Sequence, residues 1–248
     1  DRPQLLFFSV FGSNHYKYNN CKKVFFTGET RSVSSNEYDL SFGFDNTSEK
    51  NYKLPLWVLY INWFNITHPN NCNPSYLVDN NSLQQRQYIQ KNKFCNFIFN
   101  NPAPERLVLL DELNRYKNVD CAGSLRNNVG SQINGDEKTK LDYMKDYKFS
   151  IAFENTKYNG YVTEKILHAF AANTIPIYWG SDDVVSYFNE KAFINCNKLS
   201  FTDAVEWIKK IDENEELFKQ YLQAPLFNGE FCKDFLVESV ANRLLGLL

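Results

Sequence analysis

The sequence predicts an α/β fold in which helices cover both faces of a parallel sheet, and three observations support this prediction. After Lys91, apolar segments of strand length alternate with segments of helix length, which is typical of βαβ units. The 248 residues suffice for one large domain or two small ones. A hydrophobic content of 43% and a charged content of 23% are those of an ordinary globular protein.

The first third of the chain predicts short strands separated by polar loops. Leu5–Val10 and Val24–Phe26 are apolar runs of strand length, and Tyr38–Phe44 alternates aromatic or apolar with polar residues. Leu54–Phe64 is strongly apolar, but Pro55 argues against an uninterrupted central strand. The polar stretch Thr67–Gln90 is expected to pass from one domain to the next.

The remainder of the chain predicts five strands, five longer helices and one short helix, in alternation except for the two helices at the end. The expected strands are Phe94–Phe99, Val119–Ala122, Phe149–Phe153, Thr174–Trp179 and Ala192–Cys196. The expected helices are a segment opened by Pro102 and Pro104 with Leu107, Leu110 and Leu113 as its apolar stripe, then Asp136–Lys145, Val162–Ala172, a segment from Ser200 to Lys210, and Asp212–Gln223. Ser200 and Asp203 resemble a capping box, and Asp182-Asp183 is expected to start a short helix after Gly180.

Composition excludes two broad classes of function. The net charge is −2, whereas general nucleic-acid binders carry a basic surface. No apolar run reaches the roughly 18 residues that a membrane helix requires, and Gln4–Val10 lacks the basic flank of a signal peptide. The first residue is Asp1 rather than Met, so we expect a processed chain or a fragment of a longer one.

The cysteines do not have the pattern of a metal site. Six cysteines occur without CxxC spacing, and the chain has only three histidines, which argues against zinc. Scattered cysteines in a chain of this length are usually reduced residues of the core. We therefore expect a cytoplasmic protein, with membrane association left open for the full-length protein.

A candidate ligand site follows the expected strand Phe149–Phe153. Ligands of parallel sheets bind at the carboxyl ends of the strands, which places Glu154–Tyr161 at the expected crevice. Asn159 or Gly160 is expected to begin the next helix. The buried face of that helix would carry Val162, Ile166, Ala169 and Phe170 at helical spacing.

The opposite face of the same helix carries Tyr161, Glu164, Lys165 and His168 at helical spacing. A helix N-terminus favours an anion such as a diphosphate, and a lysine there adds a point charge. Spacing alone equally fits a solvated helix face with an exposed Glu–Lys pair. The choice between these interpretations depends on the motifs in the surrounding sequence.

These sequence motifs are similar to those of the α1,3-fucosyltransferase family, which is glycosyltransferase family 10. The chain resembles a bacterial-type member that is shortened at its N-terminus. The resemblance is densest over residues 147–180 and extends more loosely back to residue 25 and forward to about residue 207. The words that carry it are Tyr147-Lys-Phe-Ser-Ile-Ala-Phe-Glu-Asn, Gly160-Tyr-Val-Thr-Glu-Lys-Ile and Thr174-Ile-Pro-Ile-Tyr-Trp-Gly, with Phe25-Phe-Thr-Gly-Glu further back.

The resemblance implies two Rossmann-like domains facing a cleft, an arrangement called GT-B. We expect an acceptor-side domain over residues 1–90, a GDP-fucose-binding domain over 91–230 and a C-terminal helix over 231–248. Members of the family carry a further βα unit before the segment Leu5–Val10, so the N-terminal domain is expected to be incomplete. The C-terminal helix is expected to pack on the core.

The resemblance also implies the residues of the donor site. Tyr161, Glu164 and Lys165 match residues that contact GDP-fucose, and Asn155 would lie beside them. Arg126, in Gly123-Ser-Leu-Arg, matches an arginine that pairs with the diphosphate. These cations would stabilise the charge that develops on GDP as it leaves. No Asp-x-Asp word occurs, so we expect a transferase without a metal or other cofactor.

Inversion at the sugar carbon requires a base that takes the proton of the acceptor hydroxyl. Glu29 follows the expected strand Val24–Phe26, and the resemblance implies that it is this base. Glu37 is a weaker candidate. The expected reaction is transfer of fucose to an oligosaccharide acceptor, α1,3 to the GlcNAc of N-acetyllactosamine or to the glucose of a lactose-type glycan. Alternatives are a glycosyltransferase for another nucleotide sugar and a catalytically inactive GDP-sugar-binding domain.

Overall fold

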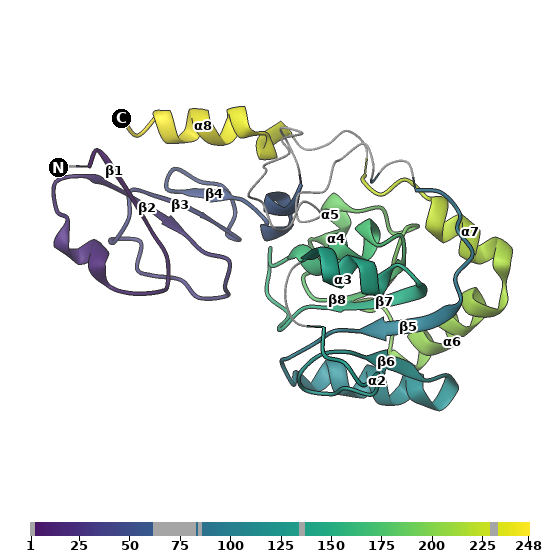
Figure 1. Ribbon diagram of the computed structural model, residues 1–248. Helices are drawn as coiled ribbons and strands as arrows, with labels where there is room; N and C mark the ends of the chain where they lie inside the picture. The colour runs from purple at the N-terminus through teal and green to yellow at the C-terminus, as the bar shows by residue number, and fades with distance from the viewer. Residues whose placement is uncertain (1–2, 62–82, 84–85, 134–136, 229–232) are drawn as a thin grey trace.

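The computed structural model describes residues 3–61, 83, 86–133, 137–228 and 233–248, and they form two separate parallel sheets. The first sheet belongs to the N-terminal part of the chain, and the second is surrounded by most of the helices (Figure 1). The α/β class and the parallel pairing predicted from the sequence are therefore confirmed. None of the described helices is long and apolar enough to cross a membrane.

The first sheet has four strands in the order β1-β2-β3-β4. They are β1 (Leu5–Phe8), β2 (Lys22–Phe26), β3 (Leu40–Gly43) and β4 (Asn51–Lys53), and a 3-10 turn, η1 (Asn14–Lys17), follows β1. All neighbouring pairs are parallel. The first three strands confirm the sequence prediction, whereas β4 was not predicted.

A short buried turn connects the first sheet to the second half of the molecule. The apolar segment expected from residue 54 onward contains a 3-10 helix, η2 (Leu56–Tyr60), rather than a strand, and Pro55 precedes it. Trp57 is 1% exposed, and its backbone N–H donates to the carbonyl of Val162 at 3.3 Å. The indole also packs against the ring of Phe188. One apolar core therefore continues from the first sheet into the second half.

The second sheet has five parallel strands in the order β6-β5-β7-β8-β9. They are β5 (Lys93–Phe97), β6 (Val119–Cys121), β7 (Tyr147–Phe153), β8 (Ile175–Trp179) and β9 (Ile194–Asn195). Phe149, Ile151 and Phe153 of β7 belong to one buried cluster and Ala152 to the other. Successive side chains of a strand point to opposite faces, so both faces of this sheet are buried, as predicted.

Helices cover the two faces of the second sheet. One face carries α2 (Pro104–Tyr116), α6 (Phe201–Glu213) and α7 (Glu215–Gln223), and the other carries α3 (Glu137–Met144) and α4 (Glu164–Ala171), with α5 (Val184–Tyr187) after β8. The Ser200 hydroxyl accepts from the backbone N–H of Asp203 at 3.1 Å, which confirms the predicted cap of α6. Asn214, not Asp212, precedes α7 and caps it.

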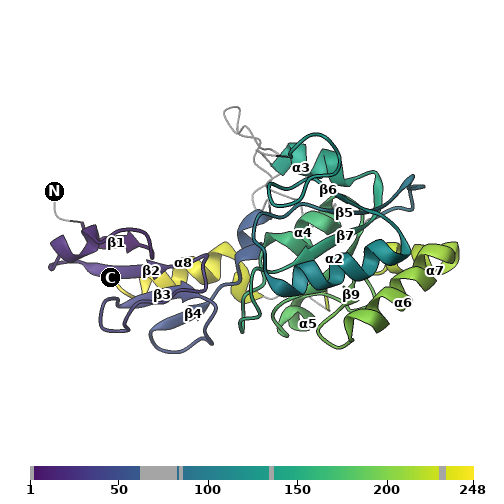
Figure 2. The same ribbon diagram turned by 90° about the horizontal axis from the view of Figure 1, so that it is seen from below.

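The last helix, α8 (Val237–Leu245), lies alongside the first sheet (Figure 2). Val240 and Leu244 pack against the core that the sheet shares with the second half. Arg243 donates to the carbonyls of Ser48 and Glu49, which precede β4. The prediction that the terminal helix packs on the core is confirmed, and the helix covers the N-terminal sheet.

Three cysteines are residues of the core, as expected. Cys95, Cys121 and Cys196 are buried with free thiols, whereas Cys21 is half-buried. Cys72 and Cys232 lie outside the described residues, as does most of the predicted passage 67–90.

Candidate functional site

The order of the second sheet places its switch point between β5 and β7. From β5 the chain runs outward to β6 and then returns across β5 to form β7 on the other side. Ligands of such sheets bind beyond the carboxyl ends of the two strands that flank this point. Residues 98–103 follow β5, and residues 154–163 follow β7. The expected crevice at Glu154–Tyr161 therefore lies at the switch point.

A fully buried carboxylate organises the turn from β7 into α4. Glu154 is 0% exposed, and its Oε1 accepts from the backbone N–H of Thr163 at 2.8 Å. Its Oε2 accepts from the hydroxyl of Thr163 at 2.8 Å and from Nζ of Lys165 at 3.0 Å. A buried charge is tolerated only with such partners. Glu154, which the sequence analysis did not single out, thus caps the helix and fixes the position of Lys165.

The beginning of α4 differs from the sequence prediction. The helix begins at Glu164, not at Asn159 or Gly160, because Thr163 is extended and its N–H and hydroxyl donate to the Glu154 carboxylate. The predicted buried face of Val162, Ile166, Ala169 and Phe170 is confirmed. The polar face is not a solvated stripe, since Tyr161 is 4% exposed and His168 is 0% exposed.

Two carboxylates surround the Lys165 ammonium. Besides Glu154, Oε1 of Glu164 lies 3.7 Å from Nζ, and the Lys165 side chain is 22% exposed. Burial works against the charged lysine, but the two carboxylates outweigh it and raise the pKa of Lys165. Burial likewise opposes the Glu164 carboxylate, yet the Lys165 and Lys140 ammonium groups lower the pKa of Glu164 to about 2. Both groups are therefore charged at neutral pH.

Lys140 of α3 joins this cluster through a neutral histidine. Its Nζ lies 3.0 Å from Nδ1 of His168 on α4. Burial, reinforced by the charge of Lys140, holds the pKa of His168 well below its usual range. The imidazole is therefore neutral, and Nδ1 accepts the hydrogen bond from the ammonium.

Arg106 is a further cation that the sequence analysis missed. It is 2% exposed and donates to the carbonyls of Phe153 at 2.6 Å and Asn101 at 3.2 Å. The guanidinium thereby joins the carboxyl end of β7 to the loop after β5. The buried residues of α2 are Arg106, Leu109, Leu110 and Leu113, and Leu107, the first residue of the predicted stripe, packs against the same core while partly exposed. Arg106 could have been identified from the sequence, because it is a charged residue at a position that helical spacing places on the buried face of α2.

The loop between β7 and α4 is held against the first sheet by Gly160. This residue has a φ of +77°, and a Cβ atom there would lie 2.3 Å from the carbonyl oxygen of Phe44. Its N–H donates to Oγ of Ser181 at 3.0 Å. The neighbouring Tyr161 ring meets the Phe44 ring edge to face, with centroids 5.1 Å apart. The loop between β7 and α4 and the first sheet are thus in direct contact.

We expect Gly160→Ala to destabilise the protein by about 2–4 kcal/mol, because backbone strain and the clash with Phe44 add up. Urea unfolding of both proteins at pH 7 measures this difference. Gly130→Ala is the matched control, since Gly130 has a φ of +80° with nothing within 4 Å and isolates the backbone term. Equal losses in the two variants would contradict the importance of the contact with Phe44.

Glu29 lies across from this loop, at the end of β2. It is exposed, and hydrogen bonds between the Thr27 hydroxyl and the backbone of Glu29, at 2.8 and 3.0 Å, fix the turn that carries it. Glu29 and Tyr158 line one pocket, which opens between the ends of β2 and β3 and the loop after β7. Burial raises the pKa of Tyr161 to about 12, and the charge of Glu29 contributes to this rise.

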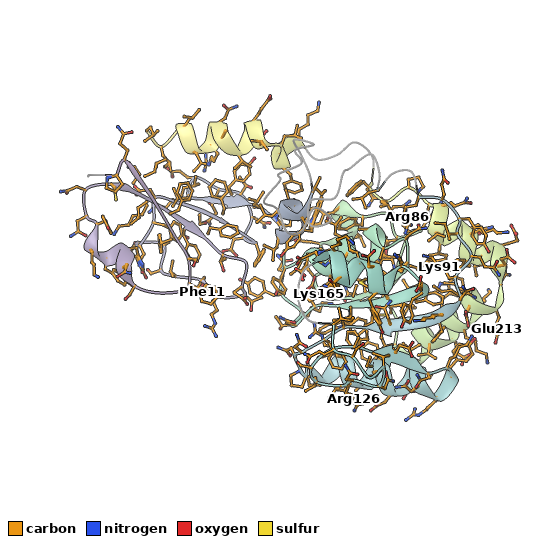
Figure 3. The ribbon with its side chains drawn as sticks, in the orientation of Figure 1. Phe11, Arg86, Lys91, Arg126, Lys165 and Glu213 are labelled. Carbon is orange, nitrogen blue, oxygen red and sulfur yellow. The ribbon has the colours of Figure 1, made fainter. Side chains whose placement is uncertain are left out.

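Arg126 and Asn155 are exposed, and Arg126 is not part of the Lys165 cluster. The Arg126 guanidinium pairs with Asp111 of α2 at 3.1 Å, and its side chain is 46% exposed. Figure 3 shows Arg126 beside α2 and Lys165 nearer to the first sheet. Asn155 is exposed in the turn directly after Glu154. The structure thus brings together Tyr161, Glu164 and Lys165 with Glu29 nearby, but leaves Arg126 apart.

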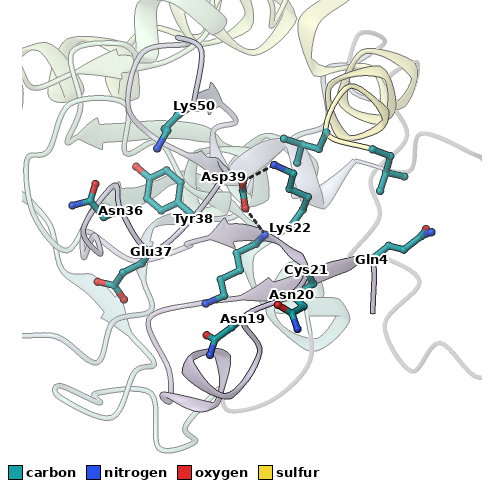
Figure 4. Close-up of a pocket in the computed structure, with 13 residues that line it drawn as sticks. Gln4, Asn19, Asn20, Cys21, Lys22, Asn36, Glu37, Tyr38, Asp39 and Lys50 are labelled. Atoms are coloured by element: carbon teal, nitrogen blue, oxygen red, sulfur yellow. Dashed lines mark hydrogen bonds and ion pairs between the residues drawn. The ribbon is translucent and has the colours of Figure 1, made fainter. Parts of the chain in front are cut away.

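A larger pocket of about 750 Å³ lies at the opposite end of the first sheet (Figure 4). Gln4, Lys22, Asp39 and Lys50 line it from the amino ends of the four strands, whereas ligands bind at carboxyl ends. Glu37, the weaker candidate for the base, also lines this pocket and accepts from the hydroxyl of Tyr16 at 2.6 Å. Glu37 therefore lies away from the Lys165 cluster.

The site combines cations for an anionic ligand with carboxylates that accept from hydroxyl groups. Within the described ranges, no group of three or more His, Cys, Asp or Glu side chains could hold a metal ion. Arg106, Lys140 and Lys165 are the cations around Glu154 and Glu164. Such a cluster fits a phosphate-bearing ligand with hydroxyl groups.

Comparison with known protein families gives two matches that together span most of the chain. A profile described as glycosyltransferase family 10 (fucosyltransferase), C-terminal, matches residues 83–224. A second profile, the N-terminal domain of alpha-(1,3)-fucosyltransferase FucT, matches residues 1–60.

Individual relatives agree with the profiles. An alpha-(1,3)-fucosyltransferase of Helicobacter pylori is 33% identical over 229 residues, which are 83% of this chain and 47% of the relative. The human GDP-fucose protein O-fucosyltransferase 3 is 25% identical over 221 residues, 83% of this chain and 44% of the relative. The chain thus spans about half the length of these curated relatives. A crystal structure of an α1,3-fucosyltransferase with GDP-fucose superposes with a TM-score of 0.76 at 27% identity, covering 98% of this chain and 77% of the other.

Proposed function

Because the chain belongs to glycosyltransferase family 10, the fucosyltransferases, we propose that it transfers fucose from GDP-fucose to a hydroxyl of an acceptor glycan. The observation that carries the proposal is the placement of Lys165 and Glu164 at the β5–β7 switch point, with Glu29 facing the same loop across a pocket. This arrangement offers an anion site at the start of α4 and a base beside the loop that leads into it.

The proposed reaction inverts the anomeric carbon in one displacement. The acceptor oxygen attacks this carbon, its proton passes to the Glu29 carboxylate, and the bond from the carbon to the GDP oxygen breaks. Negative charge develops on the departing diphosphate. Nζ of Lys165 gives hydrogen bonds to Oε2 of Glu154 and Oγ1 of Thr163, so its third N–H is left for a phosphate oxygen.

We assign three further residues to the donor site from their position after β7 and from the protonation state or polarity of their side chains. Glu164 stays ionised, because its pKa is lowered to about 2, and its carboxylate can accept from sugar hydroxyls. Tyr161 stays protonated, because burial raises its pKa to about 12. Asn155 is exposed in the turn at the carboxyl end of β7, where its amide can reach a bound nucleotide. All three residues lie in residues 154–165, so one segment would hold the donor.

We propose that the Arg126 guanidinium gives up its ion pair with Asp111 and pairs with the diphosphate of the bound donor instead. The exposed pair Arg126–Asp111 is worth little, about 0–1 kcal/mol, so a diphosphate can displace the carboxylate. We expect Arg126→Ala to weaken GDP binding about tenfold or more, and Arg126→Lys to restore little of it, because lysine lacks the bidentate fork. Calorimetric titration with GDP measures the effect.

Arg115→Ala is the control for this prediction. Arg115 lies on the surface of α2 and, like Arg126, pairs with an acidic residue of that helix, Glu112, but its side chain is 71% exposed. Unchanged GDP affinity in Arg126→Ala would remove Arg126 from the donor site and leave the structural pair with Asp111 as its role.

The acceptor is proposed to be the GlcNAc of N-acetyllactosamine or the glucose of a lactose-type glycan, with an α1,3 linkage. We assign it to residues 1–90 and the donor to residues 91–230. The two pocket walls support this division, since Glu29 comes from the first sheet and Tyr158 from the loop after β7. The helix over residues 231–248 would stabilise the acceptor side, because α8 packs along the first sheet.

One assay tests the proposed function: GDP-fucose with lactose and with N-acetyllactosamine, with the product linkage determined by NMR. A thermal-shift comparison of GDP with UDP and ADP tests the donor, and preference for UDP or ADP would favour another nucleotide sugar. Binding of GDP without turnover of GDP-fucose would favour a catalytically inactive GDP-sugar-binding domain.

A further inference from the structure

Tyr158 occupies an unusual place, because it belongs to the donor-side loop but faces the first sheet. Tyr158 is 38% exposed, and it lines the pocket at the ends of β2 and β3. Two residues later, Gly160 touches the carbonyl of Phe44 so closely that only hydrogen fits there, and its N–H is held by Ser181. The loop is therefore fixed near Tyr158, so its ring lines the pocket before any ligand binds.

The pocket itself has a volume of only about 30 Å³, room for about one water, so a sugar would lie over its mouth, where Glu29, Asp45 and Tyr158 are exposed. The chemistry of these residues suits a neutral sugar. The charged members of the pocket are Glu29, Asp45 and Arg31, which are two carboxylates and one guanidinium, or a net charge of −1. Hydroxyl groups of Thr and Ser residues and four aromatic rings, those of Phe25, Tyr38, Phe44 and Tyr158, supply the rest of the polar and aromatic lining. Aromatic faces accept the C–H groups of a pyranose, and carboxylates with a guanidinium bind its hydroxyl groups.

The distribution of charge separates this pocket from the nucleotide site. The cations Arg106, Lys140 and Lys165 gather around α4, whereas the Tyr158 pocket has an excess of negative charge. A diphosphate would be repelled by Glu29 and Asp45 and attracted by the lysine cluster. The anionic donor and a neutral ligand can thus be held side by side without exchanging places.

We propose that Tyr158 is a specificity-determining residue, the aromatic platform on which a neutral hexopyranose of the acceptor stacks, with Glu29 and Asp45 accepting from its hydroxyl groups. The inference rests on the proposed function and adds the residue that selects the acceptor. One short loop then serves both substrates, because it presents Tyr158 to the acceptor and leads into Tyr161 and Lys165 on the donor side.

Steady-state kinetics with lactose and N-acetyllactosamine test the proposal. We expect Tyr158→Ala to raise the KM for the preferred disaccharide about fivefold or more, with the KM for GDP-fucose and the calorimetric affinity for GDP unchanged within twofold. Tyr158→Phe should behave like the unchanged protein, because it keeps the ring. Tyr18→Ala is the control, since Tyr18 is 43% exposed and is not part of the pocket.

Two results would overturn the proposal while leaving fucose transfer intact. One is an unchanged disaccharide KM in Tyr158→Ala. The other is a raised KM for GDP-fucose with weaker GDP binding, which would place Tyr158 against the donor.

A binding measurement separates this inference from the proposed function. Saturation-transfer NMR with lactose or N-acetyllactosamine and no nucleotide needs no turnover. If GDP-fucose is not consumed but a disaccharide signal is present and is lost in Tyr158→Ala, the sugar site stands and the proposed function fails. Absence of any saturable disaccharide signal in the unchanged protein would overturn the sugar site itself.

Discussion

Replacing Glu29 by glutamine is expected to lower fucose transfer by at least a hundredfold while GDP binds as before. General-base catalysis contributes about 10²–10⁴ to the rate, and glutamine keeps the shape of the side chain but cannot take a proton. The fold should tolerate the change, because Glu29 is exposed and its turn is fixed by the Thr27 hydroxyl and the backbone. Transfer kinetics and GDP calorimetry on the same preparation measure the two quantities.

Glu37→Gln is the matched control for Glu29→Gln. Its carboxylate is held by the hydroxyl of Tyr16 and by His15, and the hydrogen bond from Tyr16 lowers the pKa of Glu37. It lies at the amino ends of the strands, so we expect unchanged transfer. Near-normal turnover in Glu29→Gln would show that Glu29 is not the base, and loss of turnover in Glu37→Gln alone would move that role to Glu37.

The placement of Glu29 illustrates what the sequence could predict about the site. A parallel sheet brings the carboxyl ends of its strands to one edge, so a residue just after a predicted strand can be assigned to that edge without a structure. Glu29 and Glu154 both follow predicted strands. Sequence alone could not show that the two edges face each other, because the contact between Gly160 and Phe44 joins residues far apart in the chain.

The differences from prediction concern elements that lack a hydrophobic period. Strand β4 has three residues, Asn51, Tyr52 and Lys53, and lies beside β3 at the edge of the sheet that the described residues form, so it is too short for an alternation to reveal it. Helix α4 begins later than predicted because Glu154 caps it from nine residues away, a partner outside the local capping patterns. Arg106 occupies a core position on α2, where sequence analysis expects an apolar residue.

Replacing Lys165 by methionine is expected to have the second large effect, on both stability and GDP affinity. The fully buried Glu154 would lose a charged partner at 3.0 Å, and breaking a buried ion pair costs about 3–5 kcal/mol. Protonation of Glu154 would relieve part of this, because burial raises its pKa. GDP affinity should fall tenfold or more through loss of a charged hydrogen bond to phosphate. Urea unfolding and calorimetry measure the two losses.

Lys148→Met is the control for the stability effect, because Lys148 also pairs with a buried carboxylate. Its Nζ lies 2.7 Å from Oδ1 of Asp212, whose side chain is 3% exposed, at the opposite end of β7. Asp212 keeps Lys117 as a partner, so the expected loss of stability is smaller, and GDP affinity should not change. A fall in GDP affinity here would mean that any weakening of β7 disturbs the site.

The double variant Glu154→Gln with Lys165→Met separates the structural and the donor-binding roles of Lys165. Glutamine removes the buried charge yet can still accept from the backbone N–H of Thr163, so much of the lost stability should return. GDP affinity should stay low, because no cation remains at this position to meet the phosphate. Recovery of GDP affinity together with stability would assign Lys165 to the fold alone, and the diphosphate would then have to be held by Arg126 and the first turn of α4.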